Sequence, residues 1–296
     1  MNHEQMTARI ADGQGFIAAL DQSGGSTPKA LRGYGVEDGE WSGDDEMFAA
    51  IHAMRSRVIT APCFGEGKVI GAILFEKTMD GTVDGKPTAD ALKDRGIVPF
   101  IKVDQGLADE ANGAQMMKPL DKLDALLEKS VANGMFGTKM RSIIKSANPQ
   151  GIADVVAQQF EVGNKIADAG LMPMLEPEYD ITASDRAEGE DILLAEIKKG
   201  LDALPEDRQV MLKLSIPVRP GHYTTLTEHP RVLRVVALSG GYSTDEACEK
   251  LAKNPGMIAS FSRGLLQDLR KDQSDEQFDG CLRSAIEKIA SASAAG

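Results

Sequence analysis

Histidine and cysteine, the side chains that most often bind zinc in proteins, are scarce in this sequence. The 296 residues include four histidines and three cysteines, and the cysteines lie far apart with no CxxC spacing. None of the histidines falls at the end of a predicted strand beside a second ligand. We therefore expect reduced cysteines, no metal site and no cofactor.

Long apolar runs and an excess of basic residues are also absent. No apolar segment approaches transmembrane length, and the residues after Met1 do not form a signal region. Acidic residues outnumber basic ones by 45 to 33, and the formal charge of −12 disfavours nucleic acid and anionic membranes as partners. These features predict a cytoplasmic protein that acts on small molecules.

Nucleotide-binding fingerprints and domain linkers are missing as well. The segment Gly13-Gln-Gly15 precedes a predicted strand instead of following one, and no GxxxxGK[ST] loop occurs. No stretch rich in proline, serine or glycine divides the chain. We therefore expect one domain over residues 1–296.

An alternation of strand and helix patterns fills the chain. Short apolar runs predict eight strands, at residues 15–21, 69–75, 98–104, 136–141, 171–176, 209–217, 234–238 and 257–260. Apolar residues at helical spacing predict helices near residues 44–57, 88–95, 120–131, 149–170 and 192–204. Capping patterns at Ser243 and Ser274 predict two more.

Eight strand-helix units of about 37 residues each favour an α/β fold, the (β/α)8 TIM barrel. An extra N-terminal helix around Met6 and Ile10 precedes the first strand. The stretch before residue 44 is predicted as a turn and a loop, and the tail 291–296 as frayed.

Lys213 lies in the middle of one apolar run, Gln209 to Pro217. A strand buried on both faces can hardly hold an uncompensated ammonium group, so Lys213 must be paired or take part in chemistry. Burial and nearby cations favour a neutral amine, and a neutral amine can attack a carbonyl to form a Schiff base. A lysine at a strand end with its head in water is the alternative.

Further polar residues fall at the ends of the predicted strands, where barrel enzymes place their catalytic groups. They are Asp21, Lys102, Asp104, Lys139, Arg141, Glu176, Glu178, Ser239 and, just past the last strand, Arg263. Strand side chains alternate between faces, so residues two apart, such as Lys139 and Arg141, can point together into the barrel mouth. Any one pair has a plain explanation as a salt bridge, but their convergence on one axis predicts a site.

Two glycine-serine turns lie where a barrel can bind phosphate. Residues 239–243 follow the seventh predicted strand and Arg263 follows the eighth, and the loops after these strands are a frequent phosphate site. Ser23-Gly-Gly-Ser26 follows the first strand. It is predicted to hold a second phosphate, with Lys102 or Arg141 opposite.

In their order and placement, these segments resemble class I (Schiff-base) fructose-bisphosphate aldolase in its short bacterial form. The resemblance runs over essentially the whole chain, through residues 19–26, 101–104, 137–141, 176–178, 212–213, 238–241 and 260–263. It implies reversible cleavage of fructose 1,6-bisphosphate to dihydroxyacetone phosphate and glyceraldehyde 3-phosphate, in glycolysis or gluconeogenesis. It also implies a homo-oligomer that needs no metal.

The resemblance implies a role for each residue. Lys213 would form the imine, Glu176 would be a general acid/base, and Asp21 would assist carbon–carbon cleavage at the C4 hydroxyl. Lys139 and Glu178 would support proton transfers and the electrostatics of the pocket. The implied phosphate-binding residues are Ser239, Gly240 and Arg263 for dihydroxyacetone phosphate, and Ser23, Ser26, Lys102 and Arg141 for the other phosphate.

Two positions depart from the family pattern. The animal enzymes end in a tyrosine that takes part in a proton transfer, whereas this sequence has no tyrosine after Tyr242, so another group or water would act there. Ser262 stands before Arg263 where many relatives have glycine, which could change how backbone amides approach a phosphate.

Two other functions fit parts of the pattern. One is a different Schiff-base enzyme, such as a transaldolase or an aldolase for another sugar phosphate. The other is a non-catalytic barrel that keeps only an anion pocket. The intact set of Asp21, Lys139, Glu176 and Lys213 argues against the scaffold, which has no need for a buried amine beside a proton shuttle.

Overall fold

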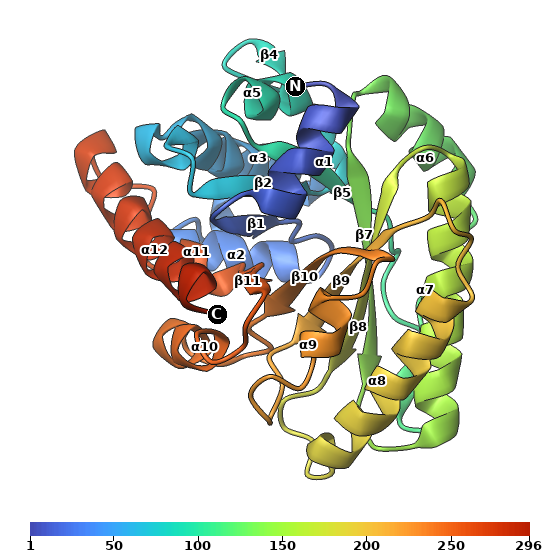
Figure 1. Ribbon diagram of the computed structural model, residues 1–296. Coiled ribbons are helices and arrows are strands. Elements are labelled where there is room, and N and C mark those ends of the chain that lie inside the picture. Colours follow the sequence, from blue (N-terminus) through green and yellow to red (C-terminus); the bar gives the residue numbers. More distant parts are fainter.

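The computed structural model describes all residues, 1–296. Eight parallel strands form a nearly closed barrel, in the order in which they occur along the chain (Figure 1). They are β1 (Phe16–Leu20), β2 (Val69–Leu74), β5 (Val98–Lys102), β7 (Gly137–Ile144), β8 (Met172–Tyr179), β9 (Val210–Ser215), β10 (Val232–Leu238) and β11 (Met257–Ala259). The predicted (β/α)8 barrel is confirmed.

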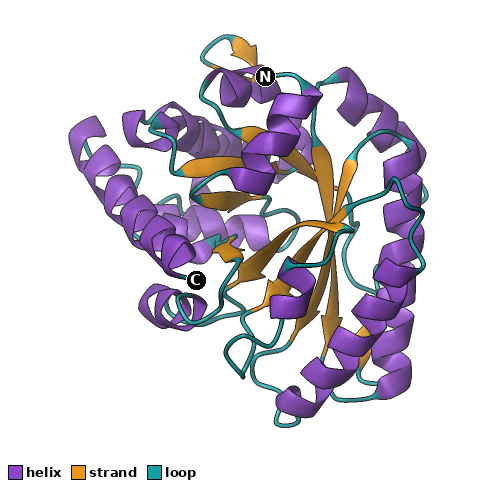
Figure 2. Cartoon of the chain, viewed as in Figure 1, coloured by secondary structure: helices purple, strands orange, loops and turns teal.

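Helices surround the strands on the outside, as the purple ribbons around the orange sheet show (Figure 2). They are α1 (His3–Asp12), α2 (Ser26–Tyr34), α3 (Gly43–Thr60), α4 (Glu76–Met79), α5 (Thr88–Asp94), α6 (Leu123–Ala132), α7 (Pro149–Asp168), α8 (Arg186–Asp202), α9 (Thr224–Thr227), α10 (Thr244–Leu251), α11 (Arg263–Leu266) and α12 (Asp275–Ala295). Short 3-10 turns lie at Asp38–Glu40 and Pro62–Gly65, and β3 (Thr82–Val83) and β4 (Lys86–Pro87) form a small hairpin. β6 (Ala114–Gln115) pairs antiparallel with β7.

The barrel interior is apolar at the end where the strands begin. Met174 and Met211 are fully buried there, together with Phe100. The N-terminal helix α1 adds Met6 and Ile10 to the same cluster, so it covers this end of the barrel. The opposite end, where the strands finish, is therefore the end at which polar groups can reach a cavity.

A separate, larger apolar core lies between the strands and the outer helices. It draws on the opposite faces of the same strands, because neighbouring strand residues point to opposite sides of the sheet. Both faces of each strand are buried as a result, which is why the strands read as continuous apolar runs in the sequence. None of the helices is both long and apolar enough to cross a membrane.

The structure corrects two expectations about local structure. Part of the stretch predicted as turn and loop forms α2, which Leu31 and Tyr34 anchor to the core. The tail predicted as frayed belongs to α12, which continues to Ala295. Ala292 and Ser293 are buried there. Their small side chains let the helix pack closely against β11.

Ser293 ties the end of α12 to the barrel. Its hydroxyl accepts a hydrogen bond of 2.9 Å from the backbone N–H of Ala259 in β11 and donates one of 2.9 Å to the carbonyl of Ile289. A barrel strand N–H would lose its acceptor if this hydroxyl were removed. The cost of such a buried, unsatisfied donor is about 1–3 kcal/mol.

We therefore predict that Ser293→Ala lowers the free energy of unfolding by about 1–3 kcal/mol, measured by urea denaturation. Ser291→Ala, on the exposed side of the same helix turn, is the matched control and should change it by less than about 0.5 kcal/mol. Equal stability of the two variants would show that the tail does not support the barrel.

Candidate active site

Three charged side chains stand directly above the apolar layer of the barrel. Met174 and Met211 point into the interior, so the residues two positions further on, Glu176 and Lys213, point the same way. Lys139 joins them from β7, where it lies opposite Met174 in the strand register. All three charged side chains are buried.

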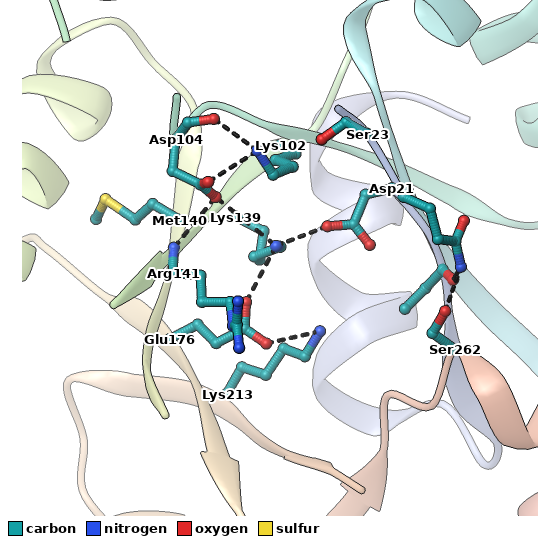
Figure 3. A network of polar contacts seen from close by, with 12 residues as sticks. Asp21, Ser23, Lys102, Asp104, Lys139, Met140, Arg141, Glu176, Lys213 and Ser262 are labelled. Atoms are coloured by element: carbon teal, nitrogen blue, oxygen red, sulfur yellow. Dashed lines mark hydrogen bonds and ion pairs between the residues drawn. The ribbon is translucent and has the colours of Figure 1, made fainter. Parts of the chain in front are cut away.

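The carboxylate of Glu176 lies between the two lysines (Figure 3). One oxygen, Oε1, is 3.0 Å from Nζ of Lys213, and the other, Oε2, is 3.1 Å from Nζ of Lys139. A buried ammonium group needs such a partner, because the loss of water around it is otherwise uncompensated. Lys213 is therefore paired inside the barrel, and the solvent-exposed alternative is wrong.

Lys139 is the cation at the centre of the site. Its Nζ lies 2.6 Å from Asp21 Oδ2 and 3.8 Å from Asp104 Oδ2, in addition to Glu176. Burial alone would lower the pKa of Lys139, but the charges of Asp21, Glu176 and Asp104 raise it well above its ordinary value. Lys139 consequently remains protonated throughout the physiological range.

Asp21 follows the last residue of β1 and faces the same lysines. Burial alone would raise the pKa of Asp21, but Lys139, then Lys213 and Lys102, hold it well below its usual range. Asp21 is therefore ionised at neutral pH and can accept a proton or a hydrogen bond from a hydroxyl group.

Asp104 links the central lysine to a second one. Its Oδ1 is 2.8 Å from Nζ of Lys102, and its Oδ2 accepts a hydrogen bond of 3.2 Å from the backbone N–H of Arg141. Lys102 also donates to the backbone carbonyl of Asp104, at 2.6 Å. These bonds fix the loop after β5 against β7.

Arg141 and Glu178 form a further ion pair beside this cluster. Nε of Arg141 is 2.5 Å from Oε2 of Glu178, and the carboxylate is the more buried of the two partners. The two residues come from adjacent strands, β7 and β8. Both side chains line the cavity at the barrel mouth.

Gln159, which was not among the predicted site residues, supports the cluster from outside the barrel. This fully buried residue of α7 donates to Ser142 Oγ at 2.9 Å and accepts from the backbone N–H of Glu176 at 3.2 Å. It therefore joins β7 and β8 at the level of Glu176. Its position on the apolar face of α7 was the available signal, because a glutamine there must find buried partners.

A cavity of about 1360 Å³ opens above these groups. All of the site residues predicted from the sequence line it: Asp21, Ser23, Ser26, Lys102, Lys139, Arg141, Glu176, Glu178, Lys213, Ser239, Gly240 and Arg263. The hydroxyl of Ser26 is already engaged in its own turn, since it accepts from the N–H of Ser23 and donates to the carbonyl of the same residue. Lys29 and Arg270 add further positive charge to the rim.

The loop after β10 requires glycine at one particular position. Gly240 has a φ of +62°, and a Cβ built there would lie 2.5 Å from Cγ2 of Ile181. A side chain would therefore clash and strain the backbone. Glycine lets the loop turn tightly beneath Ile181 and leads it to Ser243, whose hydroxyl caps α10 by accepting from the N–H of Glu246.

Comparison with known proteins identifies the family. A family model described as class-I fructose-bisphosphate aldolase matches residues 3–189, more than half of the chain. The chain belongs to the class-I fructose-bisphosphate aldolase family. The matched segment contains Asp21, Lys139 and Glu176 and ends before Lys213.

Solved structures support the same fold. Fructose-bisphosphate aldolase from Plasmodium falciparum superimposes with a TM-score of 0.78 at 19% identity, covering 98% of this chain and 94% of that one. A protein from Corynebacterium glutamicum matches with a TM-score of 0.54 at 16% identity, covering 98% of this chain and 92% of that one. At these identities the likeness concerns the fold alone.

The balance of charge around Lys139 predicts a pH-dependent stability. In the native chain, the lowered pKa of Asp21 contributes stability above its ordinary pKa of 3.8, and this contribution is lost as the pH falls below it. Lys139→Met leaves buried carboxylates without their cation and raises their pKa values. The variant should therefore lose more stability as the pH rises.

We expect Lys139→Met to lower the free energy of unfolding by about 3–5 kcal/mol at pH 8, and by less at pH 5, where the carboxyls can take up a proton. Urea denaturation at both pH values measures the difference. Lys145→Met, which removes a surface pair with Glu110, is the control and should cost less than about 1 kcal/mol at either pH. A loss for Lys139→Met that did not depend on pH would contradict the assignment.

Proposed function

We propose that this protein cleaves fructose 1,6-bisphosphate reversibly to dihydroxyacetone phosphate and glyceraldehyde 3-phosphate, through a Schiff base on Lys213. The observation that carries the proposal is the pairing of Lys213 with Glu176 at 3.0 Å, inside a cavity with Asp21 and Lys139. An amine beside a carboxylate that can accept and return its proton is what Schiff-base chemistry needs. The metabolic context would be glycolysis or gluconeogenesis.

Glu176 serves the formation of the imine in this proposal. It accepts a proton from Lys213, and the neutral amine then attacks the C2 carbonyl of the open-chain sugar to give a carbinolamine. Glu176 returns the proton to the departing hydroxyl group, so that water leaves and an iminium forms. Lys139 keeps its proton throughout, because its three carboxylate neighbours raise its pKa.

Asp21 serves the cleavage step. As an ionised carboxylate it accepts the proton of the C4 hydroxyl, and the electrons of the C3–C4 bond move into the iminium to give an enamine. The C4 carbon leaves as the aldehyde. Water or another group then protonates the enamine at C3, and Asp21 gives up its proton to solvent. Attack of water on the resulting iminium releases dihydroxyacetone phosphate and free Lys213.

The two ends of the substrate would meet positive charge and backbone amides. Ser239, Gly240 and the exposed side chain of Arg263 line the cavity and would hold the phosphate of dihydroxyacetone phosphate. Ser23, Lys102 and Arg141 also line the cavity and would hold the other phosphate. The second hydroxyl of the first turn, that of Ser26, would instead shape the loop, because it is bonded to Ser23.

We predict that Lys213→Met abolishes cleavage of fructose 1,6-bisphosphate in a coupled assay, because the variant has no amine to form the imine. The variant should fold normally, since Glu176 keeps its contact with Lys139 at 3.1 Å. Circular dichroism and thermal unfolding provide the control. A folded variant with near-normal turnover would remove Lys213 from the mechanism. In a separate test on the wild type, loss of activity on adding a chelator would contradict the metal-free chemistry.

Arg263→Ala tests the phosphate site separately. The side chain of Arg263 is exposed to solvent, so its removal should leave the unfolding temperature unchanged. Loss of a charge-assisted hydrogen bond to phosphate is worth about 1.5–3 kcal/mol, which corresponds to a KM raised about tenfold to a hundredfold. An unchanged KM for fructose 1,6-bisphosphate would mean that Arg263 does not bind its phosphate. It would favour a Schiff-base aldolase for another sugar phosphate.

A further inference from the structure

Arg55 is a fully buried arginine that contacts no carboxylate. It lies on α3 with none of its surface exposed, and its Nε has no hydrogen-bond partner. Burial lowers the pKa of Arg55 to about 10, and the nearest acidic influence on it comes from Asp21. A buried charge with neutral partners is costly, so its retention requires an explanation beyond packing.

The guanidinium of Arg55 is used to hold the segment that follows β1. Its Nη2 donates to the backbone carbonyl of Gln22 at 2.5 Å and to the side-chain oxygen of the same residue at 3.2 Å. On the other side, its Nη1 donates to the hydroxyl of Thr78 at 2.7 Å. Arg55 therefore fixes both the backbone and the side-chain orientation of Gln22.

Gln22 in turn contacts the loop after β11. Its amide nitrogen donates to the hydroxyl of Ser262 and, at 3.2 Å, to the carbonyl of Ala19. The amide orientation follows from the arginine, because the oxygen that accepts from Arg55 leaves only the nitrogen to face Ser262. Glycine at position 262 would offer no such acceptor.

This contact lies at the seam where the barrel closes. β1 and β11 are the two ends of the strand order and form no paired ladder, and a backbone hydrogen bond of 3.3 Å from Ala19 to Phe261 crosses between them. Every other pair of neighbouring strands around the barrel is joined by a parallel ladder. The seam therefore depends more than the other interfaces on side-chain contacts.

We propose that Arg55, Gln22 and Ser262 form a clamp that fixes the relative positions of Asp21 and Arg263. Gln22 is the next residue after Asp21, and Ser262 immediately precedes Arg263. The clamp thereby sets the distance between the group that accepts the C4 hydroxyl proton and the group that binds a phosphate. This inference rests on the proposed aldolase function. The three clamp residues are positioning residues, and they act through their neighbours.

Ser262→Ala is the most direct test, because it removes one hydroxyl from the seam. Thr78→Val is the matched control, since it also removes a hydroxyl that bonds within the Arg55 network, but on the side away from the seam. We expect Ser262→Ala to lower kcat/KM for fructose 1,6-bisphosphate about tenfold. The control should retain the wild-type value even if its unfolding temperature falls, and Ser262→Thr should restore activity.

Coupling between the two loops is measured with Gln22→Met alone and combined with Ser262→Ala. If the clamp acts as one unit, the double variant should lose no more kcat/KM than the worse single variant. Fully additive losses would contradict the clamp. So would equal kinetic effects of Ser262→Ala and Thr78→Val, because these would indicate a general loss of stability.

Hydrogen–deuterium exchange of the ligand-free protein separates this inference from the proposed function. Ser262→Ala should speed exchange at the amide of Ala19 and in the segments around residues 21–24 and 261–264, whereas Thr78→Val should not. Unchanged exchange at the seam would overturn the clamp whatever the enzyme does. If Ser262→Ala speeds exchange at the seam but the wild-type protein cleaves no sugar phosphate, the aldolase function is overturned and the seam contact is supported.

Discussion

One buried carboxylate, that of Glu176, holds together the charged centre of this barrel. It is shared between Lys213 and Lys139, and Lys139 in turn is neutralised by Asp21 and Asp104. The apolar layer beneath these groups, with Met174 and Met211, keeps water out from below. Each buried charge is consequently stabilised by an opposite charge within the cluster.

The convergence of these charged residues at one end of the barrel could be predicted from the sequence, because strand periodicity and barrel topology follow simple rules. Lys213 stands out because a charged residue inside an apolar run needs a partner, and Glu176 is its partner through the parallel pairing of β8 and β9. The glycine at position 240 is explained by a positive φ beneath Ile181. The predicted cavity residues converge because parallel strands end on one side of a barrel.

Other features could not be predicted, because they depend on contacts between segments distant in sequence. The helix α2 contains glycine and proline, so its local helix propensity is low, and tertiary packing stabilises it instead. The end of α12 is ordered by a hydrogen bond between Ser293 and the backbone of β11, which no local pattern encodes. Arg55 and Gln159 lie on the buried faces of α3 and α7, but the partners that their polar groups reach come from segments distant in sequence.

The central claim is that Lys213 is the nucleophile of a Schiff-base reaction. The most direct test is borohydride reduction of the protein mixed with dihydroxyacetone phosphate, with and without a chelator, followed by peptide mass spectrometry. The account predicts a reduced adduct on Lys213 that the chelator does not affect, even though Lys139 lies in the same cavity. An adduct on another lysine, or none on the folded protein, would contradict it.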